Sequence, residues 1–97
     1  MHLYAILRRN GWSSPDELKE AAGRSGRVGD DMPDNVRWIR SYVLAEHAGS
    51  LGTICIYEAK HPSAIREHAA LAGLPVDEII PIADTVVIRP DPVAATA

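Results

Sequence analysis

Four segments of the chain have the apolar patterning and residue types of β-strands, and they predict four strands. The segments are residues 3–8, 36–44, 53–59 and 78–88, and they are rich in β-branched and aromatic residues. Residues 3–8 carry apolar side chains on both parities, which is typical of a central strand that is covered on both faces. Pro81 lies within the last segment, so this strand is expected at a sheet edge, at a bulge, or as two shorter strands.

Two further segments repeat apolar side chains at the three-four spacing of a helix. The first is predicted over residues 15–32, with Ser14 as its N-cap and Pro15 at its first position. Its three glycines each cost up to ~1 kcal/mol relative to alanine, so packing against a sheet has to compensate. The second helix begins at His61-Pro62 and ends at Gly73, a residue that favours the left-handed cap.

The order of these elements is β-α-β-β-α-β, the split arrangement of ferredoxin-like domains. Right-handed crossovers place both helices on one face of a four-stranded antiparallel sheet. We therefore predict an α+β fold with a single ferredoxin-like domain over residues 1–90. Residues 91–97 are small or proline and predict a flexible C-terminal tail.

Two helices cover only one face of such a sheet, so the composition of the other face is informative. Strict alternation predicts that the helices cover Ile39, Val43, Ile54 and Ile56. The uncovered face then carries Trp38, Arg40, Tyr42, Cys55 and Tyr57. This set is too aromatic for solvent and too polar for an ordinary core, so it either packs against a second copy, forming a dimeric α+β barrel, or lines a ligand pocket, or does both. A β-bulge would exchange the two faces.

Composition narrows the possible partners. The 97 residues are 46% hydrophobic and 24% charged, as in an ordinary globular domain, and the net charge of -3 gives no electrostatic footprint for nucleic acid. No apolar run approaches the ~20 residues that span a bilayer, and the first residues lack the pattern of a signal peptide. A single cysteine excludes an internal disulfide and a cysteine-rich zinc site. We expect a cytoplasmic protein without nucleic-acid or membrane partners.

The histidines are the candidate metal ligands, but their spacing is unfavourable. His61 and His68 are seven residues apart, which is about 10.5 Å of helix axis and too far for both to bind one ion. A metal site would have to combine separate segments or two subunits, with a carboxylate such as Glu58 supplying oxygen ligands.

Each candidate also has a structural explanation. His61 lies where it would cap a helix, and His68 borders an apolar face, as expected for a hydrogen-bonded core histidine. Glu58 would form an ion pair with Arg40 or Lys60. A buried, inert thiol is the expected state of the chain's single cysteine. No nucleophile elbow, phosphate loop or dinucleotide fingerprint occurs, so no motif indicates catalysis.

Four strings in fixed order resemble domain-of-unknown-function family 4242, small bacterial proteins often labelled nickel-binding. They are residues 36–43 (VRWIRSYV), 54–59 (ICIYEA), 65–69 (IREHA) and 72–75 (AGLP), and the resemblance covers about residues 2–88. It implies a ferredoxin-like homodimer that binds nickel or another divalent ion. His68 and Glu58 lie inside the strings and are the first candidate ligands. His61 stands where members of the family commonly carry aspartate, so it either adds a ligand or weakens the helix cap.

Three functions remain open at this point. The first is a small, dimeric, non-enzymatic binding protein for a nickel-type divalent ion or a small ligand. The second is a dimeric α+β-barrel enzyme acting on a small organic substrate, in which Arg40 holds an anionic group, Tyr42 or Tyr57 donates a hydrogen bond, and His68 or Glu58 moves a proton. The third is a structural or regulatory partner protein.

Overall fold

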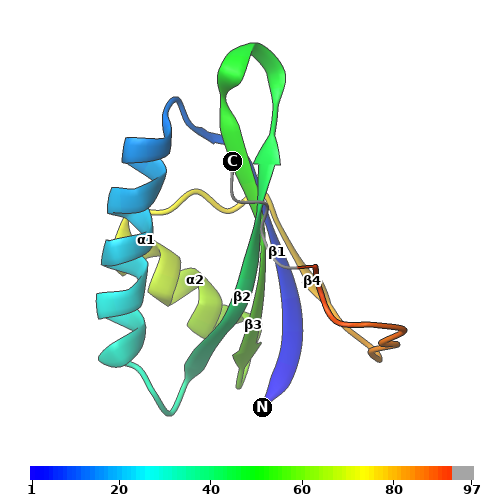
Figure 1. Cartoon of the computed structure of the whole chain (residues 1–97). Helices are drawn as coiled ribbons and strands as arrows, with labels where there is room; N and C mark the ends of the chain where they lie inside the picture. Colours follow the sequence, from blue (N-terminus) through cyan, green and yellow to red (C-terminus); the bar gives the residue numbers. More distant parts are fainter. Residues whose placement is uncertain (93–97) are drawn as a thin grey trace.

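The computed structural model describes residues 1–92, which form one four-stranded antiparallel sheet and two α-helices. The strand order is β2-β3-β1-β4, and Figure 1 shows both helices on the same face of the sheet. The predicted α+β class and βαββαβ order are therefore confirmed. In chain order the elements are β1 (His2–Trp12), α1 (Pro15–Asp30), β2 (Val36–Ala45), the 3-10 turn η1 (His47–Gly49), β3 (Leu51–Ala59), α2 (Pro62–Ala72) and β4 (Glu78–Pro81).

Helix α1 begins at its predicted residue and ends two residues earlier than predicted, at Asp30. Ser14 has an extended backbone, and its Oγ accepts a hydrogen bond of 3.2 Å from the amide of the third helical residue. Pro15 occupies the first turn, where its missing N–H costs no intrahelical bond. Ala21 and Ser25 are buried on the side of the helix that faces the sheet. This packing compensates for the low helix propensity of the glycines.

Strand β4 is short, and the prediction of a strand over residues 78–88 is wrong beyond Pro81. Pro81 pairs with Tyr4, and one more hydrogen bond follows, from the Ile82 amide to the Leu3 carbonyl at 3.0 Å. Strand β1 begins only one residue before Leu3, so it offers no further backbone partner to the residues after Ile82. Residues 83–92 leave the sheet as an exposed segment (Figure 1). Residues 93–97 of the predicted flexible tail lie outside the described residues.

The hydrophobic core lies between the sheet and the two helices. Alternate residues of β1 and β3 point into it, and α2 closes it from the other side. Full burial of an aliphatic or aromatic side chain of this size contributes about 1.5–3 kcal/mol. The core cluster consists of Tyr4, Ile6, Met32, Val36, Cys55, Tyr57, Ala59 and Ile65.

Strand β3 faces the helices with the side chains that were predicted for the uncovered face. Tyr57 and Cys55 are buried beneath the helices, opposite Tyr4 and Ile6 of β1. By alternation, the two isoleucines of β3 lie on the uncovered face. The predicted faces of β3 are therefore wrong. Both parities of this central strand are apolar, so alternation does not distinguish them, and the Tyr57 hydroxyl finds its hydrogen-bond partner on α1.

A β-bulge at Ile39 divides the face predicted for β2. Trp38 pairs with Tyr57, whereas Arg40 pairs with the next residue of β3, so Ile39 is the extra residue. Trp38 stacks on Tyr57 at 6.1 Å between ring centroids and therefore lies on the side of the helices. Arg40 and Tyr42 lie on the uncovered face, as predicted. The five residues predicted to share one face are thus split between two.

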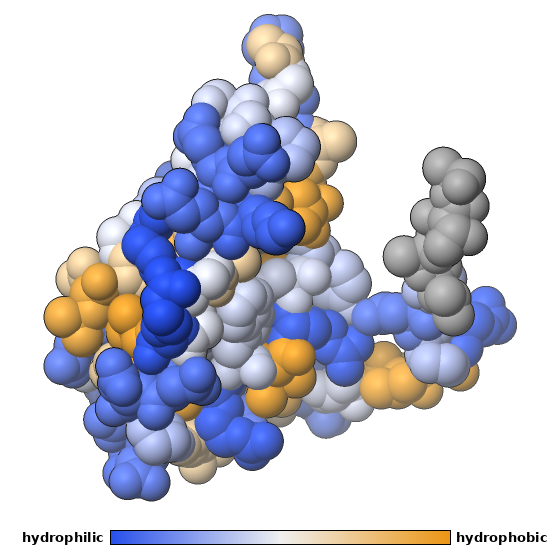
Figure 2. Space-filling view, turned by 60° about the vertical axis from the view of Figure 1, so that its left-hand side comes forward, coloured by the Kyte–Doolittle hydropathy of each residue, from blue (hydrophilic) through white to orange (hydrophobic). Residues whose placement is uncertain are grey.

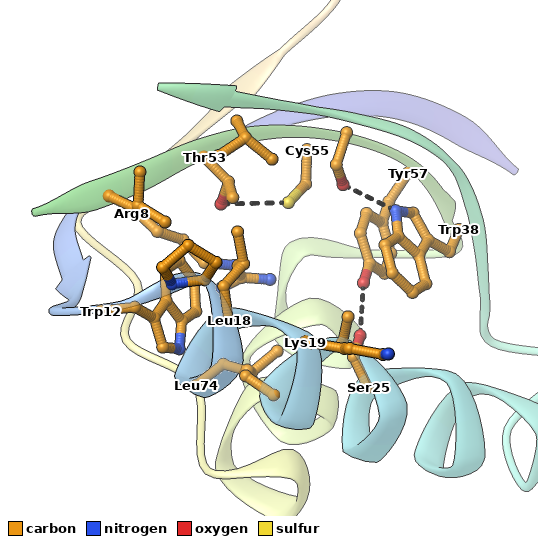
Figure 3. Close-up of a pocket in the computed structure, with 16 residues that line it drawn as sticks. Arg8, Trp12, Leu18, Lys19, Ser25, Trp38, Thr53, Cys55, Tyr57 and Leu74 are labelled. Atoms are coloured by element: carbon orange, nitrogen blue, oxygen red, sulfur yellow. Dashed lines mark hydrogen bonds between the residues drawn. The ribbon is translucent and has the colours of Figure 1, made fainter. Parts of the chain in front are cut away.

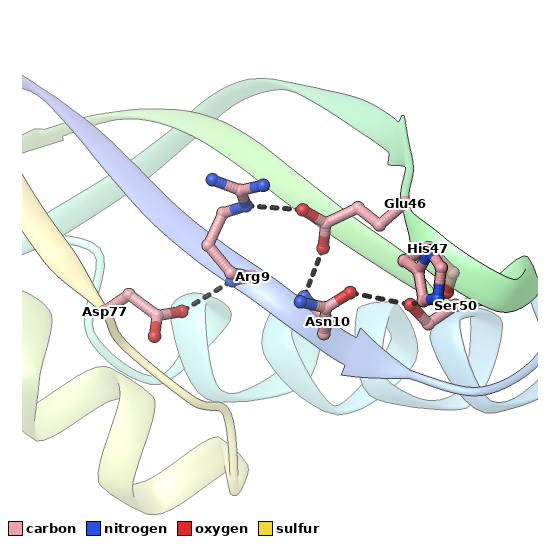
Figure 4. A network of polar contacts seen from close by, with 6 residues as sticks. All are labelled: Arg9, Asn10, Glu46, His47, Ser50 and Asp77. Carbon is pink, nitrogen blue, oxygen red and sulfur yellow. Dashed lines mark hydrogen bonds and ion pairs between the residues drawn. The ribbon is translucent and has the colours of Figure 1, made fainter.

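Strand β1 bulges between Arg8 and Trp12, where three of its residues oppose one residue of β3. The Glu46 carboxylate holds this bulge, because it accepts hydrogen bonds from the Asn10 amide and the Arg9 guanidinium (Figure 4). These two hydrogen bonds lower the pKa of Glu46, and the bond from the Asn10 amide has the larger effect. Asn10 has a φ of 49°, in the left-handed region that asparagine tolerates. As a result, Arg8 and Trp12 are both buried on the side of the helices.

The outer side of the helices is hydrophilic. In the view that brings this side forward, hydrophilic side chains cover most of the surface and the apolar ones form separate patches (Figure 2). Scattered apolar side chains of this kind are normal on a solvent-facing surface. Neither helix in the described part of the chain has the length and apolar character that crossing a bilayer requires.

Gly52 stands opposite the bulge of β1, and we expect Gly52→Ala to lower the free energy of unfolding by about 1–3 kcal/mol through overpacking. A Cβ at this position would lie 2.5 Å from the Arg8 carbonyl oxygen and would also press on the Glu46 carboxylate. Gly26→Ala is the matched control, because a Cβ there meets nothing within 4 Å and adds up to ~1 kcal/mol of helix propensity. Urea unfolding of both variants measures the two effects, and equal changes in the two would contradict the role given to Gly52.

Candidate functional site

A cavity of about 490 Å³ lies between the sheet and α1 (Figure 3). Its volume falls within the range of small-molecule binding sites, ≈ 300–1,000 Å³. Residues from β1, α1, β2 and β3 form most of its walls, and Leu74, in the segment after α2, completes them. The apolar walls include Trp12, Pro15, Leu18, Ala22, Val43 and Leu74.

Arg8 is the charged group of this cavity that is removed from solvent. Its side chain points from β1 toward α1, and the residue is 1% exposed. Nη1 donates a hydrogen bond of 2.7 Å to the Pro75 carbonyl, but Nη2 is buried and has no hydrogen-bond partner among the described residues. A guanidinium stays charged at any pH at which the protein is folded, and a buried charge is costly without a counter-charge. The site therefore contains an uncompensated positive charge.

Lys19 also lines the cavity with an exposed, charged side chain, and the buried polar groups other than Arg8 are neutral. The Tyr57 and Ser25 hydroxyls share a hydrogen bond of 2.9 Å, and burial raises the pKa of Tyr57. The Cys55 thiol donates to the Thr53 hydroxyl at 3.3 Å, and this cysteine is free and buried, as predicted. The lining residues include no aspartate, glutamate or histidine. The arrangement can orient a small ligand by charge and hydrogen bonds.

His68 is a hydrogen-bonded core histidine, which was one of the two roles predicted for it. It is 1% exposed, and its ring lies edge-on to Tyr57 at 5.4 Å between centroids. Nε2 lies 3.0 Å from the Ser25 carbonyl oxygen, which only accepts, so the proton is assigned to Nε2 and the lone pair to Nδ1. Burial lowers the pKa of His68, and the charge of Arg8 lowers it further. His68 is therefore neutral at pH 7.

The structure does not bring the three predicted metal ligands together. Glu58 lies on the uncovered face, where it pairs with Arg37 at 2.9 Å, so the predicted pairing with Arg40 or Lys60 is wrong. His68 lies on the opposite side of the sheet. His61 caps α2, its Nδ1 accepting from the second residue of the helix at 3.1 Å. Within residues 1–92 no group of three or more histidine, cysteine, aspartate or glutamate side chains is placed to hold a metal ion.

The predicted ligand-binding residues fall into two places. Trp38, Cys55 and Tyr57 line the cavity beneath the helices. On the uncovered face, Arg40 pairs with Asp91 at 2.9 Å, and the Tyr42 hydroxyl donates to the same carboxylate at 2.8 Å. The anion that Arg40 holds in this structure is thus a side chain of its own chain. Whether either set binds a ligand stays a prediction.

Arg8 was not predicted as a site residue, although the sequence contains a signal for it. Arg8 shares its parity with Tyr4 and Ile6, the two core residues of β1. A charged residue at a core position of a central strand is rare unless it is paired. The roles of Ser25 and Thr53 leave no such signal, because small hydroxyl side chains are common at both buried and exposed positions.

Comparisons with known proteins indicate relatives of this fold. The profile of a family described as "Nickel responsive protein SCO4226-like" matches residues 4–82. The crystal structure of SCO4226 from Streptomyces coelicolor A3(2) superposes with a TM-score of 0.67 at 21% identity, over 87% of this chain and 99% of that chain. At this identity the likeness shows the fold alone. A search of curated proteins finds no match. The nickel-related family predicted from the sequence strings is confirmed at this level, and the label of family 4242 stays a prediction.

We expect the burial of His68 to make the stability depend on pH. Because its folded-state pKa is lowered, the unfolded chain binds more protons once the pH falls below about 6.5. The contribution of His68 to the free energy of unfolding is complete above that pH and declines as the pH falls toward the lower folded-state pKa. In His68→Gln, whose amide can still donate to the Ser25 carbonyl, this decline disappears.

Urea unfolding at successive pH values measures this effect. His47→Gln is the control, because His47 is exposed in the turn η1 and its replacement leaves the decline in place. A His68→Gln variant that loses stability over the same pH range as the parent protein would contradict the assignment.

Proposed function

The chain belongs to the family described as nickel responsive protein SCO4226-like, and from this premise we propose that it is a small, non-enzymatic binding protein whose ligand occupies the cavity between α1 and the sheet. One observation carries the proposal. The cavity contains a fully buried guanidinium, that of Arg8, whose Nη2 has no partner among the described residues. A ligand that supplies this partner would remove a desolvation cost that the free protein bears.

The composition of the cavity supports binding over the alternative of an α+β-barrel enzyme. Small-molecule sites are mostly apolar, with a few polar groups that fix orientation. Proton transfer requires a group whose pKa lies near the working pH, and such groups are usually histidine, glutamate or aspartate. The lining residues include none of these, and His68 and Glu58, the two predicted proton carriers, lie elsewhere.

We also propose that the uncovered sheet face forms the interface of a homodimer, as in an α+β barrel. Tyr42 and Ile80 are each 42% exposed on this face, and the isoleucines of β3 lie between their strands. A contiguous apolar surface on a sheet is typical of a protein interface. The hydrophilic outer side of the helices supports the sheet as the contact surface (Figure 2).

Nickel binding is the second candidate, and the description of the family favours it. The residues of one chain do not fit a nickel site, because the described part of the chain brings no three ligating side chains together. A nickel site would therefore need donors from two chains. Glu58 is the predicted ligand that lies on the proposed interface, whereas His68 is enclosed in the core and His61 is engaged in a helix cap.

The cavity proposal is tested by filling the cavity. Trp12 and Trp38 are the two tryptophans of the chain and both line it, so a bound probe quenches their fluorescence. We expect the dye 1-anilinonaphthalene-8-sulfonate to bind the parent protein and to bind Ala22→Phe about tenfold more weakly or worse, since the new ring would occupy the space of the dye. Ala70→Phe, on the exposed side of α2, is the matched control. Equal binding by the two variants would place the dye outside the cavity.

The interface proposal is tested by a charge on the uncovered face. We expect Ile80→Glu to sediment as a monomer, because a buried, unpaired carboxylate is costly, whereas Leu71→Glu, at a position 63% exposed on α2, remains a dimer. If nickel is held between two chains, calorimetric titration with nickel gives heat with Leu71→Glu and none with Ile80→Glu. A parent protein that is monomeric at all concentrations would exclude both the dimer and the shared nickel site.

A further inference from the structure

We infer that the cavity binds a monocarboxylate with an apolar chain or ring, whose carboxylate pairs with Arg8 while its apolar part contacts Trp12, Leu18 and Leu74. This inference rests on the proposed function and specifies the chemical class of its ligand. It is carried by the position of Arg8, which lines the cavity, is 1% exposed and keeps a buried Nη2 without a partner.

No ion pair within residues 1–92 gives Arg8 a counter-charge. The four ion pairs formed among the described residues involve Arg9, Arg24, Arg37 and Arg40. The two carboxylates that contact the residues following Arg8 in β1 are already engaged, since Glu46 binds Arg9 and Asn10, and Asp77 accepts from the Arg9 amide at 2.5 Å (Figure 4). Because the described residues leave Arg8 without an ion pair, a ligand would supply its negative charge.

The surroundings of Arg8 favour a single negative charge. Lys19 also lines the cavity, but it is exposed. Water can therefore hydrate its ammonium, which needs no counter-charge in the cavity. One buried guanidinium matches one carboxylate, and its planar donors fit the two oxygens of that group. A phosphate with two charges would leave one of them uncompensated in an apolar site.

Neutral donors next to Arg8 complete the polar end of the cavity. The charge of Arg8 lies close enough to Tyr57 to act on the pKa of its hydroxyl. The Tyr57 and Ser25 hydroxyls share one hydrogen bond between them, so one hydroxyl proton remains available to an acceptor. The rest of the wall is apolar and accommodates the body of the ligand (Figure 3).

A matched pair of compounds tests the inference. The pair is 4-phenylbutyrate and 4-phenylbutanamide, which have the same shape and differ in charge at pH 7. Titrations followed by tryptophan fluorescence should show that the parent protein binds the acid about tenfold more tightly than the amide or better, as expected for a charge-assisted bond in a desolvated site. In Arg8→Met, which keeps the length of the side chain and removes the charge, the preference for the acid should disappear.

The outcomes separate the inference from the proposed function. If the parent protein binds acid and amide equally, or if Arg8→Met keeps the preference, the carboxylate assignment is wrong while binding in the cavity stands. If Ala22→Phe leaves dye binding unchanged and neither compound binds, the cavity is not a ligand site and both proposals are wrong. Should Arg8→Met fail to fold, the comparison of acid and amide in the parent protein still decides the matter.

Discussion

The antiparallel pairing of β1 with β3 determines what lies beneath the helices, and the rest of the structure depends on it. Tyr4, Ile6 and Arg8 lie opposite Tyr57, Cys55 and Thr53, so one face of this pair is the floor of both the core and the cavity. A shift of one residue in either strand would move the three side chains of that strand to the other face. Two polar contacts favour the observed register: the Tyr57 hydroxyl bonds to Ser25, and Nη1 of Arg8 bonds to the Pro75 carbonyl.

A buried cation in so small a core requires a local explanation. In typical proteins, a buried charge that lacks a counter-charge lowers the free energy of unfolding by several kcal/mol. Replacing buried charges by apolar side chains of similar size is often neutral. Stability alone therefore gives no reason to keep Arg8 at a core position. A function that needs a positive charge in an apolar cavity does give a reason, and sites of function are where proteins tolerate such costs.

The sequence was sufficient to predict the elements and their arrangement, because caps, glycines and prolines mark the ends of both helices and because the βαββαβ order leaves few topologies. It was not sufficient to predict the faces. Ile54 and Ile56 appeared to be the natural core residues of β3, yet the core uses Cys55 and Tyr57, since a strand that is apolar on both parities is oriented by long-range contacts. The bulge at Ile39 then separated Trp38 from Arg40 and Tyr42. No local signal distinguishes a bulge from continuous alternation.

The same error of faces explains why the predicted ligand-binding residues lie in two separate places. Three of these five residues line a cavity, but that cavity lies between the sheet and α1 of the same chain, and its walls need no second subunit. The sheet separates it from Arg40, Tyr42 and Glu58, which lie on the uncovered face. A partner chain or a metal ion on that face and a small ligand under α1 would therefore not contact each other. Any coupling between them would have to pass through the sheet, most directly through β3, whose Tyr57 and Glu58 are adjacent residues that point to its two sides.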